Sequence, residues 1–579
     1  MATKESLPEP LDLSHHFSDV TNNREASDVK RFYKYFTTPG MHNLAAGWPH
    51  LSVFPYDTLE ASVAHPHRFE TSQSAAASTG IEHAKSKQSP PASHLKVPKE
   101  SKNTNVLGKI DLETALQYGT AEGFAPLHSF VRQFTRDHLH PNVPYANGPE
   151  VALTCGSTDG FSKTVEALTN PWIEHKNWVH EKEGILCEEF AYMNAIQAIR
   201  PRGLNIVPVA TDSYGMKPWG KGGLADILEN WDFSKGKRPH LMYTVTLGQN
   251  PTGTIIPTPR RKVIYALCQS YDIIIIEDEP YWNLQFPSAM KKLSAVDEQI
   301  VFNRNYNEHG RSSGYEFLDG LVPSYMSIDE DGRVVRIDTF SKTIAPGCRL
   351  GWLTAQPAIV ERISRITEAT TQNPSGFVQV MVAELIKGQQ GGLPSSRKDS
   401  KNSEGWQLDG WVRWLEGLRG TYERRMQAMC KVFDEGKFVA VDAKGADADS
   451  WSMINKVPMY EFEWPMAGMF VWVKVRCDTH PLVGKYGAEN VCAALWVFLT
   501  QKPFLCLAAP GSMFAPTDTV RGYAFQYLRL CFAPMPEDEV TEYSQCFTAG
   551  CRAFWQLSSF DDIPDFDPSM VASLRLPTC

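Results

Sequence analysis

The segment RVVRIDTFSKTIAPGCRLGW, residues 333–352, gives the strongest indication of fold and chemistry in this chain. Its first residues form a β-branched run that is typical of a buried strand. Lys342 follows in a polar turn beside the hydroxyls of Thr339 and Ser341, and Arg349 lies seven residues beyond it. A lysine in such a turn is usually only an exposed cation. Here the group also offers an amine that can form an imine, and a guanidinium and hydroxyls that can hold a phosphate.

A second buried strand, IIIIEDEPYW at 273–282, ends in a group of acids. Its four isoleucines place the acids at the C-terminal end of the strand. A carboxylate there is costly to bury without a cationic partner. Asp278 is therefore suited to pair with a protonated ring nitrogen, and Tyr281 follows on the same loop. A helix cap would explain Asp278 almost as well.

Two further motifs follow predicted strands. The segment TCGSTDGFSKTVEAL at 154–168 is a strand end, a glycine turn and a helix start. Free backbone N–H groups at such a start bind phosphate, and Ser157 and Thr158 add hydroxyls, although these residues are also ordinary helix caps. The segment GQNPTG at 248–253 can be only a turn. It nevertheless puts Asn250 at the C-terminal end of a strand, where ligands bind in open α/β sheets.

Between about Asp111 and Leu385, β-branched runs alternate with helical stretches such as 260–268. Strands are expected at 151–154, 184–187, 241–245, 273–276 and 333–338. This alternation predicts an α/β fold with a mostly parallel sheet sandwiched by helices. After Trp411 a long amphipathic helix leads to a strand at 468–475, which predicts a smaller α+β domain.

Near the end of the chain, YLRLCFA at 527–533 places Arg529 inside an apolar strand. A buried arginine needs an anion, and a substrate carboxylate bound through two hydrogen bonds would serve. A structural ion pair is the alternative.

The composition narrows the class of protein. A length of 579 residues suggests two or three domains, and the 42% hydrophobic and 21% charged fractions are typical of a soluble globular protein. The net charge of -9 argues against a nucleic-acid binder, and no apolar run approaches the roughly 20 residues that span a bilayer. The acidic, Pro-rich N-terminus lacks the apolar core of a signal peptide, so we expect a cytoplasmic protein. The 12 cysteines lack CxxC pairs and histidine partners, so no metal site is expected.

Three polar stretches interrupt the pattern, at about 61–105, 303–314 and 388–405. They lack hydrophobic periodicity, and we expect surface loops or disorder in each.

Together, the ordered motifs resemble those of the fold-type I pyridoxal-phosphate aminotransferases of class I and II. They are most similar to the branch that holds kynurenine/2-aminoadipate and fungal aromatic amino acid aminotransferases. Further segments that support the resemblance are NLAAGWPHLSVFP (43–55), LQYGTAEGFAPL (116–127), EEFAYMNAIQAIRP (188–201) and MAGMFVWVKV (466–475). The resemblance implies an N-terminal arm over 1–105, a large cofactor-binding domain over 106–385, and a polar loop and small domain over 386–579.

The resemblance also implies a role for each matching residue. Lys342 would bind pyridoxal phosphate covalently and move the substrate's proton, Asp278 would keep the ring nitrogen protonated, and Tyr192 would stack on the ring. Asn250 and Tyr281 would hydrogen-bond the phenolate oxygen of the ring. The phosphate would be held by Ser157, Thr158, Thr339, Ser341 and Arg349. Asp159 departs from the family pattern, because relatives often carry an amide at this position beside the phosphate.

The remaining implied roles concern the substrate and a partner. Arg529 would bind the substrate carboxylate, with Asn250 beside it, and Gly47 would lie against the substrate. Tyr118 would reach the phosphate or substrate of the neighbouring subunit, because sites in this family are shared across a homodimer. The implied reaction moves an amino group from an L-amino acid, aromatic or kynurenine/2-aminoadipate-like, to a 2-oxo acid such as 2-oxoglutarate. Another pyridoxal-phosphate reaction, a C–S lyase or a decarboxylase, remains the alternative.

Overall fold

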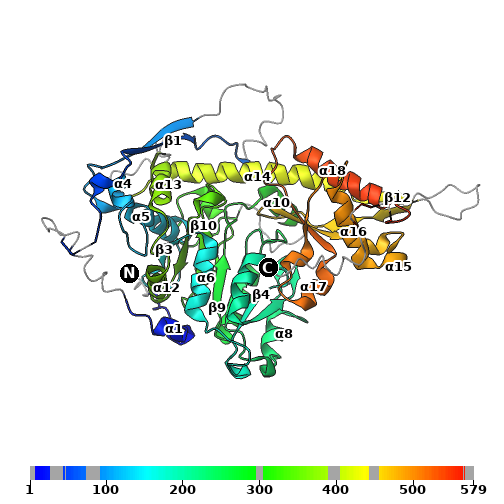
Figure 1. Cartoon of the computed structure of the whole chain (residues 1–579), viewed down its shortest axis with the longest axis horizontal. Coiled ribbons are helices and arrows are strands. Elements are labelled where there is room, and N and C mark those ends of the chain that lie inside the picture. The colour runs from blue at the N-terminus through cyan, green and yellow to red at the C-terminus, as the bar shows by residue number, and fades with distance from the viewer. Residues whose placement is uncertain are drawn as a thin grey trace, which may run out of the picture.

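The structure is a computed structural model of the chain. It describes residues 7–26, 35, 44–45, 47–72, 92–294, 304–388, 405–441, 455–561, 563–564 and 566. In Figure 1 the long helix α14 (Asp409–Gly436, yellow) runs along the top of the molecule, from the α13 region towards the C-terminal sheet. None of the helices in the described ranges combines the length and the apolar character needed to cross a membrane.

A seven-stranded sheet forms the centre of the molecule, in the order β3-β11-β10-β9-β8-β4-β5. Neighbouring strands pair in parallel from β10 to β5, and only β11 runs antiparallel to both of its neighbours. The strands are Glu150–Thr154 (β3), Gly184–Glu188 (β4), Asn205–Val209 (β5), Leu241–Thr244 (β8), Ile274–Asp278 (β9), Val334–Thr339 (β10) and Gly351–Ala355 (β11). The mostly parallel sheet predicted from the sequence is confirmed.

Helices cover both faces of this sheet. Ile274 and Ile276 pack with α6 (Ser157–Leu168), α7 (Met193–Ile199) and α12 (Pro357–Ala369). The alternate residues Ile273 and Ile275 pack on the other side with α8 (Leu224–Glu229) and α9 (Thr258–Ser270). Because successive side chains point to opposite faces, a strand covered on both sides must be apolar throughout, and all four isoleucines are fully buried.

The prediction of a loop over 61–105 is wrong at both ends. Strands β1 (Thr58–Ala64) and β2 (Ala92–Pro98) pair antiparallel there, and residues 73–91 between them lie outside the described part of the chain. Leu95 and Val97 are buried in the core that includes helix α13 (Gly376–Gly388). Only two buried residues alternate with charged ones, which is too short a period-2 pattern to stand out in a polar stretch.

Of the other two polar stretches, the first lies almost entirely within the described residues and the second lies almost entirely outside them. Residues 304–314 form turns without a helix or strand, as predicted. Their Asn307 is anchored by hydrogen bonds to the side chains of Asn142 and Asp319. Residues 389–404 of the third stretch lie outside the described residues.

The chain after α14 forms a smaller α+β unit, as predicted. Its antiparallel sheet has the order β14-β15-β17-β16. The strands are Tyr460–Phe462 (β14), Phe470–Val475 (β15), Ala509–Pro510 (β16) and Tyr527–Cys531 (β17), and the main helices are Ala488–Thr500 (α16) and Val540–Phe554 (α18). Phe433 near the end of α14 packs against Tyr460 and Phe547, so α14 joins the cores of both parts.

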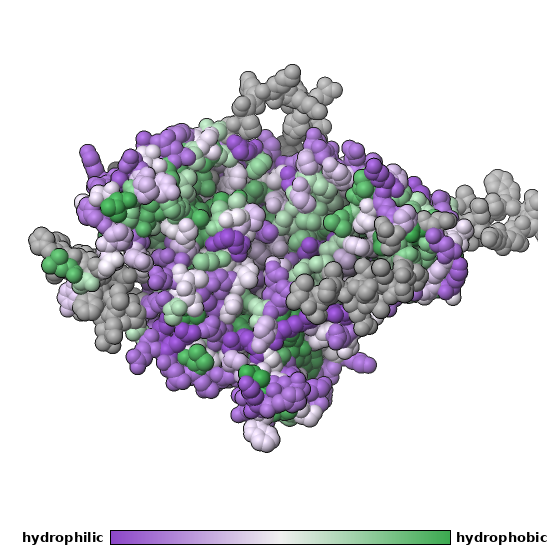
Figure 2. Space-filling model, viewed as in Figure 1, coloured by the Kyte–Doolittle hydropathy of each residue, from purple (hydrophilic) through white to green (hydrophobic). Residues whose placement is uncertain are grey.

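Shorter elements complete the described chain. The α-helices and strands among them are Asp19–Asn22 (α1), Leu112–Ala115 (α4), Ala125–Gln133 (α5), Pro287–Ser294 (α10), Glu316–Asp319 (α11), Val483–Tyr486 (α15), Asp518–Ala524 (α17), Thr211–Asp212 (β6), Gly215–Met216 (β7), Phe438–Val441 (β12) and Asn455–Pro458 (β13). On the face shown in Figure 2, purple polar residues are widespread, and green apolar residues lie among them, most of them in the upper half of the view.

Candidate active site

The residues predicted to bind the cofactor gather at the C-terminal ends of the strands that run in one direction. Asp278 is the last residue of β9, and it stands opposite Ile337 of β10 in the strand register. Asn250 lies in the loop after β8, Tyr192 caps α7 after β4, and Ser157 begins α6 after β3. This edge is where an open α/β sheet binds its ligands.

Lys342 lies in the turn directly after β10 and is half-buried. Burial lowers the pKa of its amine, and the positive charges of Arg529 and Arg349 lower it further. Thr339 and Ser341, which flank this turn, share a hydrogen bond between their hydroxyl oxygens at 2.8 Å. The amine is thus biased towards its neutral form, in which it can act as a nucleophile or take up a proton.

Asp278 is buried with one oxygen satisfied and one free. Its Oδ2 accepts a hydrogen bond from the Tyr243 hydroxyl at 3.0 Å, whereas its Oδ1 is buried without a hydrogen-bond partner. Burial raises the pKa of this carboxyl to about 7. Leaving a buried acceptor unpaired is costly, so Oδ1 marks the place for a donor from a ligand. Sequence reasoning did not assign a role to Tyr243, although its position in a predicted strand was apparent.

A phosphate-sized anion site lies at the start of α6. Gly156 precedes this helix with φ +90°, and Ser157 and Thr158 form its first turn. The Arg349 guanidinium donates a hydrogen bond to the Cys155 carbonyl oxygen at 3.4 Å, and a Cβ added to Gly156 would collide with it. Helix N–H groups, two residues with hydroxyls and a guanidinium are therefore all found at this helix start.

Asp159, the residue that departs from the family pattern, is neutralised within its own helix. Its Oδ2 accepts hydrogen bonds from the Cys155 backbone N–H and the Lys163 ammonium, both at 2.9 Å. Lys163 is buried and also donates to the Thr371 hydroxyl at 2.7 Å. The negative charge of Asp159 is thus balanced next to the anion site. Sequence reasoning missed Lys163, although its spacing of four residues from Asp159 on a predicted helix was a usable signal.

Arg529 reaches this edge of the main sheet from strand β17. Its Nη1 donates a hydrogen bond to Oδ1 of Asn250 at 2.9 Å, and its guanidinium carbon lies 4.3 Å from the ring centre of Phe470 and 4.8 Å from that of Phe514. Its Nε is buried without a hydrogen-bond partner, and no carboxylate of the described residues forms an ion pair with Arg529. A guanidinium held in this way is ready to bind an anionic ligand.

Tyr192 and Tyr281 lie around the same space. Tyr192 is half-buried, and its hydroxyl accepts a hydrogen bond from the Asn194 side chain at 2.8 Å. Tyr281 is buried edge-on against Phe470, with ring centres 5.9 Å apart. Burial raises the pKa of both tyrosines, and the charge of Asp278 raises it further. Both rings therefore lie close enough to Asp278 to feel its charge.

The structure does not bring Tyr118 or Gly47 into this group. Tyr118 is 54% exposed, and Gly47 is exposed. The Gln117 side chain donates to the Pro49 carbonyl oxygen at 3.0 Å, so the two segments lie next to each other. Within the described residues, no hydrogen bond or ring contact joins Tyr118 or Gly47 to the residues above, and their roles stay predictions.

Comparison with known proteins identifies the family that shares this arrangement. Residues 92–405, more than half of the chain, match the family model for aminotransferase class I and II. The chain belongs to this family.

Relatives along most of the length agree. An aromatic amino acid aminotransferase of Schizosaccharomyces pombe is 32% identical over 81% of this chain and 83% of its own. The L-tyrosine:2-oxoglutarate aminotransferase of Tapinella panuoides is 32% identical over 83% of this chain and 78% of its own. The crystal structure of the aminotransferase Aro8 of Candida albicans is 29% identical, covers 95% of this chain and 100% of its own, and superposes with a TM-score of 0.71.

The aminotransferases of this family depend on pyridoxal phosphate, and the residues present fit that cofactor. The unpartnered Oδ1 of Asp278 suits the protonated ring nitrogen, the start of α6 with Arg349 suits the phosphate, and the half-buried amine of Lys342 suits covalent attachment. When bound, the cofactor supplies an electron sink for the α-carbon of the amino acid.

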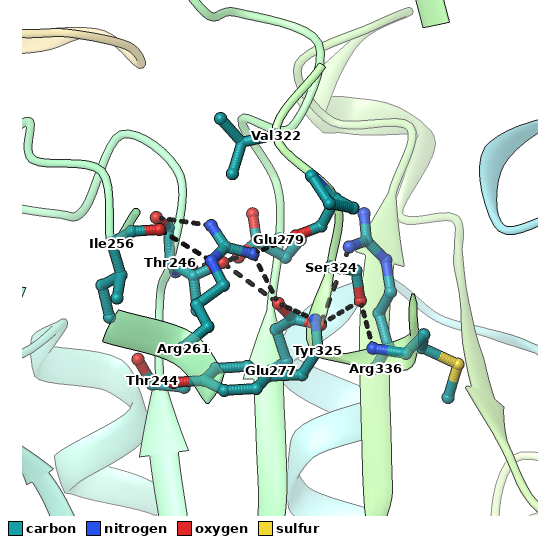
Figure 3. Close-up of polar contacts among 12 residues, drawn as sticks. Thr244, Thr246, Ile256, Arg261, Glu277, Glu279, Val322, Ser324, Tyr325 and Arg336 are labelled. Atoms are coloured by element: carbon teal, nitrogen blue, oxygen red, sulfur yellow. Dashed lines mark hydrogen bonds and ion pairs between the residues drawn. The ribbon is translucent and has the colours of Figure 1, made fainter. Parts of the chain in front are cut away.

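A buried network of charges lies beside the end of β9 in this aminotransferase (Figure 3). Glu277 accepts hydrogen bonds from the Ser324 hydroxyl and the Tyr325 backbone N–H, and it faces Arg261 across 3.5 Å. Glu279 accepts from the backbone N–H and the hydroxyl of Thr246. Because Thr246 begins the segment that leads to Asn250, these bonds fix the Asn250 loop to β9.

Two buried carboxyls of this network share one hydroxyl donor. The Thr246 hydroxyl lies within hydrogen-bonding distance of both Glu277 and Glu279, but it has a single hydrogen to donate. Burial raises the pKa of Glu279, and the negative charge of Glu277 raises it further. Glu279 is therefore easier to protonate than an exposed carboxyl. Sequence reasoning noted these acids as costly to bury but did not predict their partners.

Proposed function

We propose that this aminotransferase transfers the amino group of an aromatic L-amino acid to 2-oxoglutarate, giving the aromatic 2-oxo acid and glutamate. The relatives named above support this substrate pair, since one is described as an aromatic amino acid aminotransferase and another as an L-tyrosine:2-oxoglutarate aminotransferase. The reaction is balanced, because the amino acid exchanges its amino group and α-hydrogen for a carbonyl oxygen, and 2-oxoglutarate undergoes the reverse exchange.

The proposal rests on the aromatic residues that surround Arg529. Its guanidinium lies against the rings of Phe470 and Phe514, and the ring of Tyr281 packs on Phe470. A substrate carboxylate bound by Arg529 would therefore place the rest of the amino acid among aromatic side chains. Aromatic rings gain free energy from such neighbours, which favours an aromatic amino acid as the donor.

The residues of the chain divide the work of the reaction. Arg529 binds the substrate carboxylate and so orients the α-carbon. The amine of Lys342, whose pKa is lowered, takes the proton from that carbon and later returns a proton. Asp278 holds a proton on the ring nitrogen, with Tyr243 fixing the position of its carboxylate. The anion site at the start of α6 would hold the phosphate and so keep the cofactor in the site.

We also propose a homodimer with shared active sites. In support, Tyr118 is 54% exposed, and the large apolar residues Tyr56, Val106, Leu107 and Phe377 are exposed as well. A mixture of Tyr118→Phe and Lys342→Ala chains provides the test. If sites are shared, a hybrid dimer contains one site free of both changes and regains activity that the two parents lack. Unshared sites would leave the mixture with the sum of the parental activities.

A half-reaction screen tests the substrate assignment. Each amino acid is added to the cofactor-loaded enzyme without an acceptor, while the visible absorbance of the lysine-bound cofactor is followed. We expect rapid bleaching with phenylalanine, tyrosine, tryptophan and glutamate, and release of the matching 2-oxo acid. Slow bleaching by all aromatic amino acids would refute the aromatic preference. Repeated turnover that releases ammonia or carbon dioxide without an acceptor would instead indicate lyase or decarboxylase chemistry.

A further inference from the structure

The N-terminal segment of the chain packs against the end of the sheet that lies opposite to the active site. Its Leu11 backbone N–H donates to the Asp331 carbonyl oxygen at 2.9 Å, just before β10, and Ser18 donates to Ala167 at the end of α6 at 2.8 Å. Figure 1 shows α1 of this segment near the lower ends of α12 and α6. A short 3-10 turn, Ser14–His16, precedes α1.

Two histidines of this turn face one carboxylate. The Nε2 of His15 lies 2.6 Å from Oδ2 of Asp272, and the Nε2 of His16 lies 3.2 Å from its Oδ1. The three ligand atoms all lie within 4.8 Å of one another. Two ligands that are each about 2.0–2.1 Å from a tetrahedral zinc ion are roughly 3.3 Å apart. His16 and Asp272 already have this spacing, whereas His15 and Asp272 lie at hydrogen-bond length and would move apart slightly to admit an ion.

His16 presents to Asp272 a nitrogen that no hydrogen bond satisfies. Its side chain is buried, and its Nε2 lacks a hydrogen-bond partner. Its Nδ1 lies 3.1 Å from Nδ1 of His240, whose Nε2 lies 3.6 Å from a carboxylate oxygen of Glu183. In the tautomer suited to a metal, the Nε2–H of His240 points to Glu183, His240 Nδ1 accepts, and His16 donates from Nδ1. The lone pair on Nε2 of His16 then faces Asp272.

Two acceptors at this separation repel each other unless a cation lies between them. Arg333, a nearby cation, lies closer to Asp331, at 2.8 Å, than to Asp272, at 3.6 Å. The donation from His16 to His240 also matches the usual behaviour of a metal-bound histidine, which donates its other ring N–H to a neighbouring group.

We propose that His15, His16 and Asp272 bind a zinc ion, with water as its fourth ligand. Two imidazole nitrogens and one carboxylate oxygen form a set that zinc prefers among the common metal ions. No sequence pattern indicated this site, because Asp272 lies 257 positions from His15. The expectation of no metal site rested on cysteine and histidine spacing alone, and it did not consider a carboxylate brought in by the fold.

The zinc ion would have a structural role. Asp272 precedes β9 and Asp278 ends it, so the two are roughly 20 Å apart along an extended strand. An ion at Asp272 would therefore not touch the substrate. It would fasten the N-terminal segment to the corner between α9 and β9, and it would raise the stability of the folded chain by mass action.

Zinc binding to the full-length, cofactor-loaded enzyme tests this proposal. After treatment with a chelator, native protein and the variants His15→Ala, Asp272→Asn and His309→Ala are dialysed against increasing zinc chloride. The control His309→Ala changes an exposed histidine. We expect it and the native protein each to bind one more zinc ion per chain than His15→Ala or Asp272→Asn. Loss of one ligand should weaken this binding by at least about 100-fold. Asparagine tolerates the positive φ of +52° at position 272, so Asp272→Asn removes the charge without straining the turn.

A second measurement separates this site from cysteine sites. Cobalt bound to nitrogen and oxygen ligands lacks the thiolate charge-transfer absorbance that cysteine sites show. We expect native protein, but not His15→Ala, to show cobalt absorbance without a thiolate charge-transfer band. We also expect zinc to raise the thermal unfolding midpoint of the native protein and of His309→Ala, but not that of the two ligand variants. Equal zinc binding by native protein and both ligand variants would overturn the proposal, as would an equal loss in His309→Ala.

Discussion

Arg529 on β17 donates a hydrogen bond from Nη1 to Oδ1 of Asn250, over 2.9 Å. This bond joins the C-terminal sheet to the loop after β8 of the main sheet. It links the residue expected to bind the substrate carboxylate to the residue expected to contact the cofactor ring. The position of the guanidinium is therefore fixed before any substrate arrives, which lowers the entropy cost of binding.

The first prediction concerns Arg529→Lys. Lysine keeps the charge but loses the planar pair of donors and the stacking on Phe470 and Phe514. We expect KM for the amino acid to rise on the order of 10- to 100-fold, equivalent to about 1.4–2.8 kcal/mol, while the cofactor remains bound. Steady-state kinetics and the visible spectrum measure the two effects. Arg521→Lys, an arginine of α17 that pairs with Asp518, is the matched control. An unchanged KM would mean that another cation binds the carboxylate.

Lys163→Met is the second prediction. The variant leaves the carboxylate of Asp159 without its ammonium partner beside the anion site. Breaking such a buried pair should lower the free energy of unfolding by about 3 kcal/mol, and the unbalanced charge should weaken binding of the cofactor phosphate. Urea unfolding and equilibrium dialysis of the cofactor measure these losses. The double variant Asp159→Asn/Lys163→Met should recover most of both, and a double variant as weak as the single one would contradict this explanation.

Much of the site follows from the sequence because polar residues after parallel strands must meet at one edge of the sheet. Asp278 and Lys342 could be placed together in this way from the runs of isoleucine and valine before them. The contact between Tyr243 and Asp278 could not, because it depends on the register of two strands that are distant in sequence. Similarly, the pairing of β1 with β2 could not be predicted, because the strands are distant in sequence and their many polar residues weaken the alternating hydrophobic pattern.

The third prediction is that Lys342→Ala folds but does not catalyse transamination. The lysine is half-buried in a turn, so its removal should cost little stability, whereas the proposed reaction needs its amine to move the proton. We expect the rate to fall by a factor on the order of 10⁴ and the absorbance of the lysine-bound cofactor to disappear. Lys262→Ala, an exposed lysine of α9, should change neither. Persistence of both signals in Lys342→Ala would exclude this lysine as the attachment point.

The fourth prediction uses the pKa of Asp278. Burial raises this pKa from 3.8 to about 7, so the folded protein without cofactor keeps the proton over a range in which the unfolded chain has lost it. Stability contributed by this group therefore falls as the pH rises from about 4 to about 7, and the penalty is constant above that. An asparagine side chain cannot ionise, so Asp278→Asn should stabilise the cofactor-free protein, and by roughly 2–3 kcal/mol more at pH 8 than at pH 5.

Urea unfolding of the cofactor-free protein at the two pH values measures this difference, with Asp518→Asn, a change at an exposed aspartate, as the control. In the cofactor-bound enzyme, by contrast, Asp278→Asn should be harmful. There the carboxylate is needed to hold the proton on the ring nitrogen, so Asp278→Asn should lose at least about 100-fold in rate. A residue that lowers the stability of the cofactor-free protein but is needed by the cofactor-bound enzyme is typical of an active site. A variant that is less stable than the native protein at pH 8 would show that Asp278 has a structural role instead.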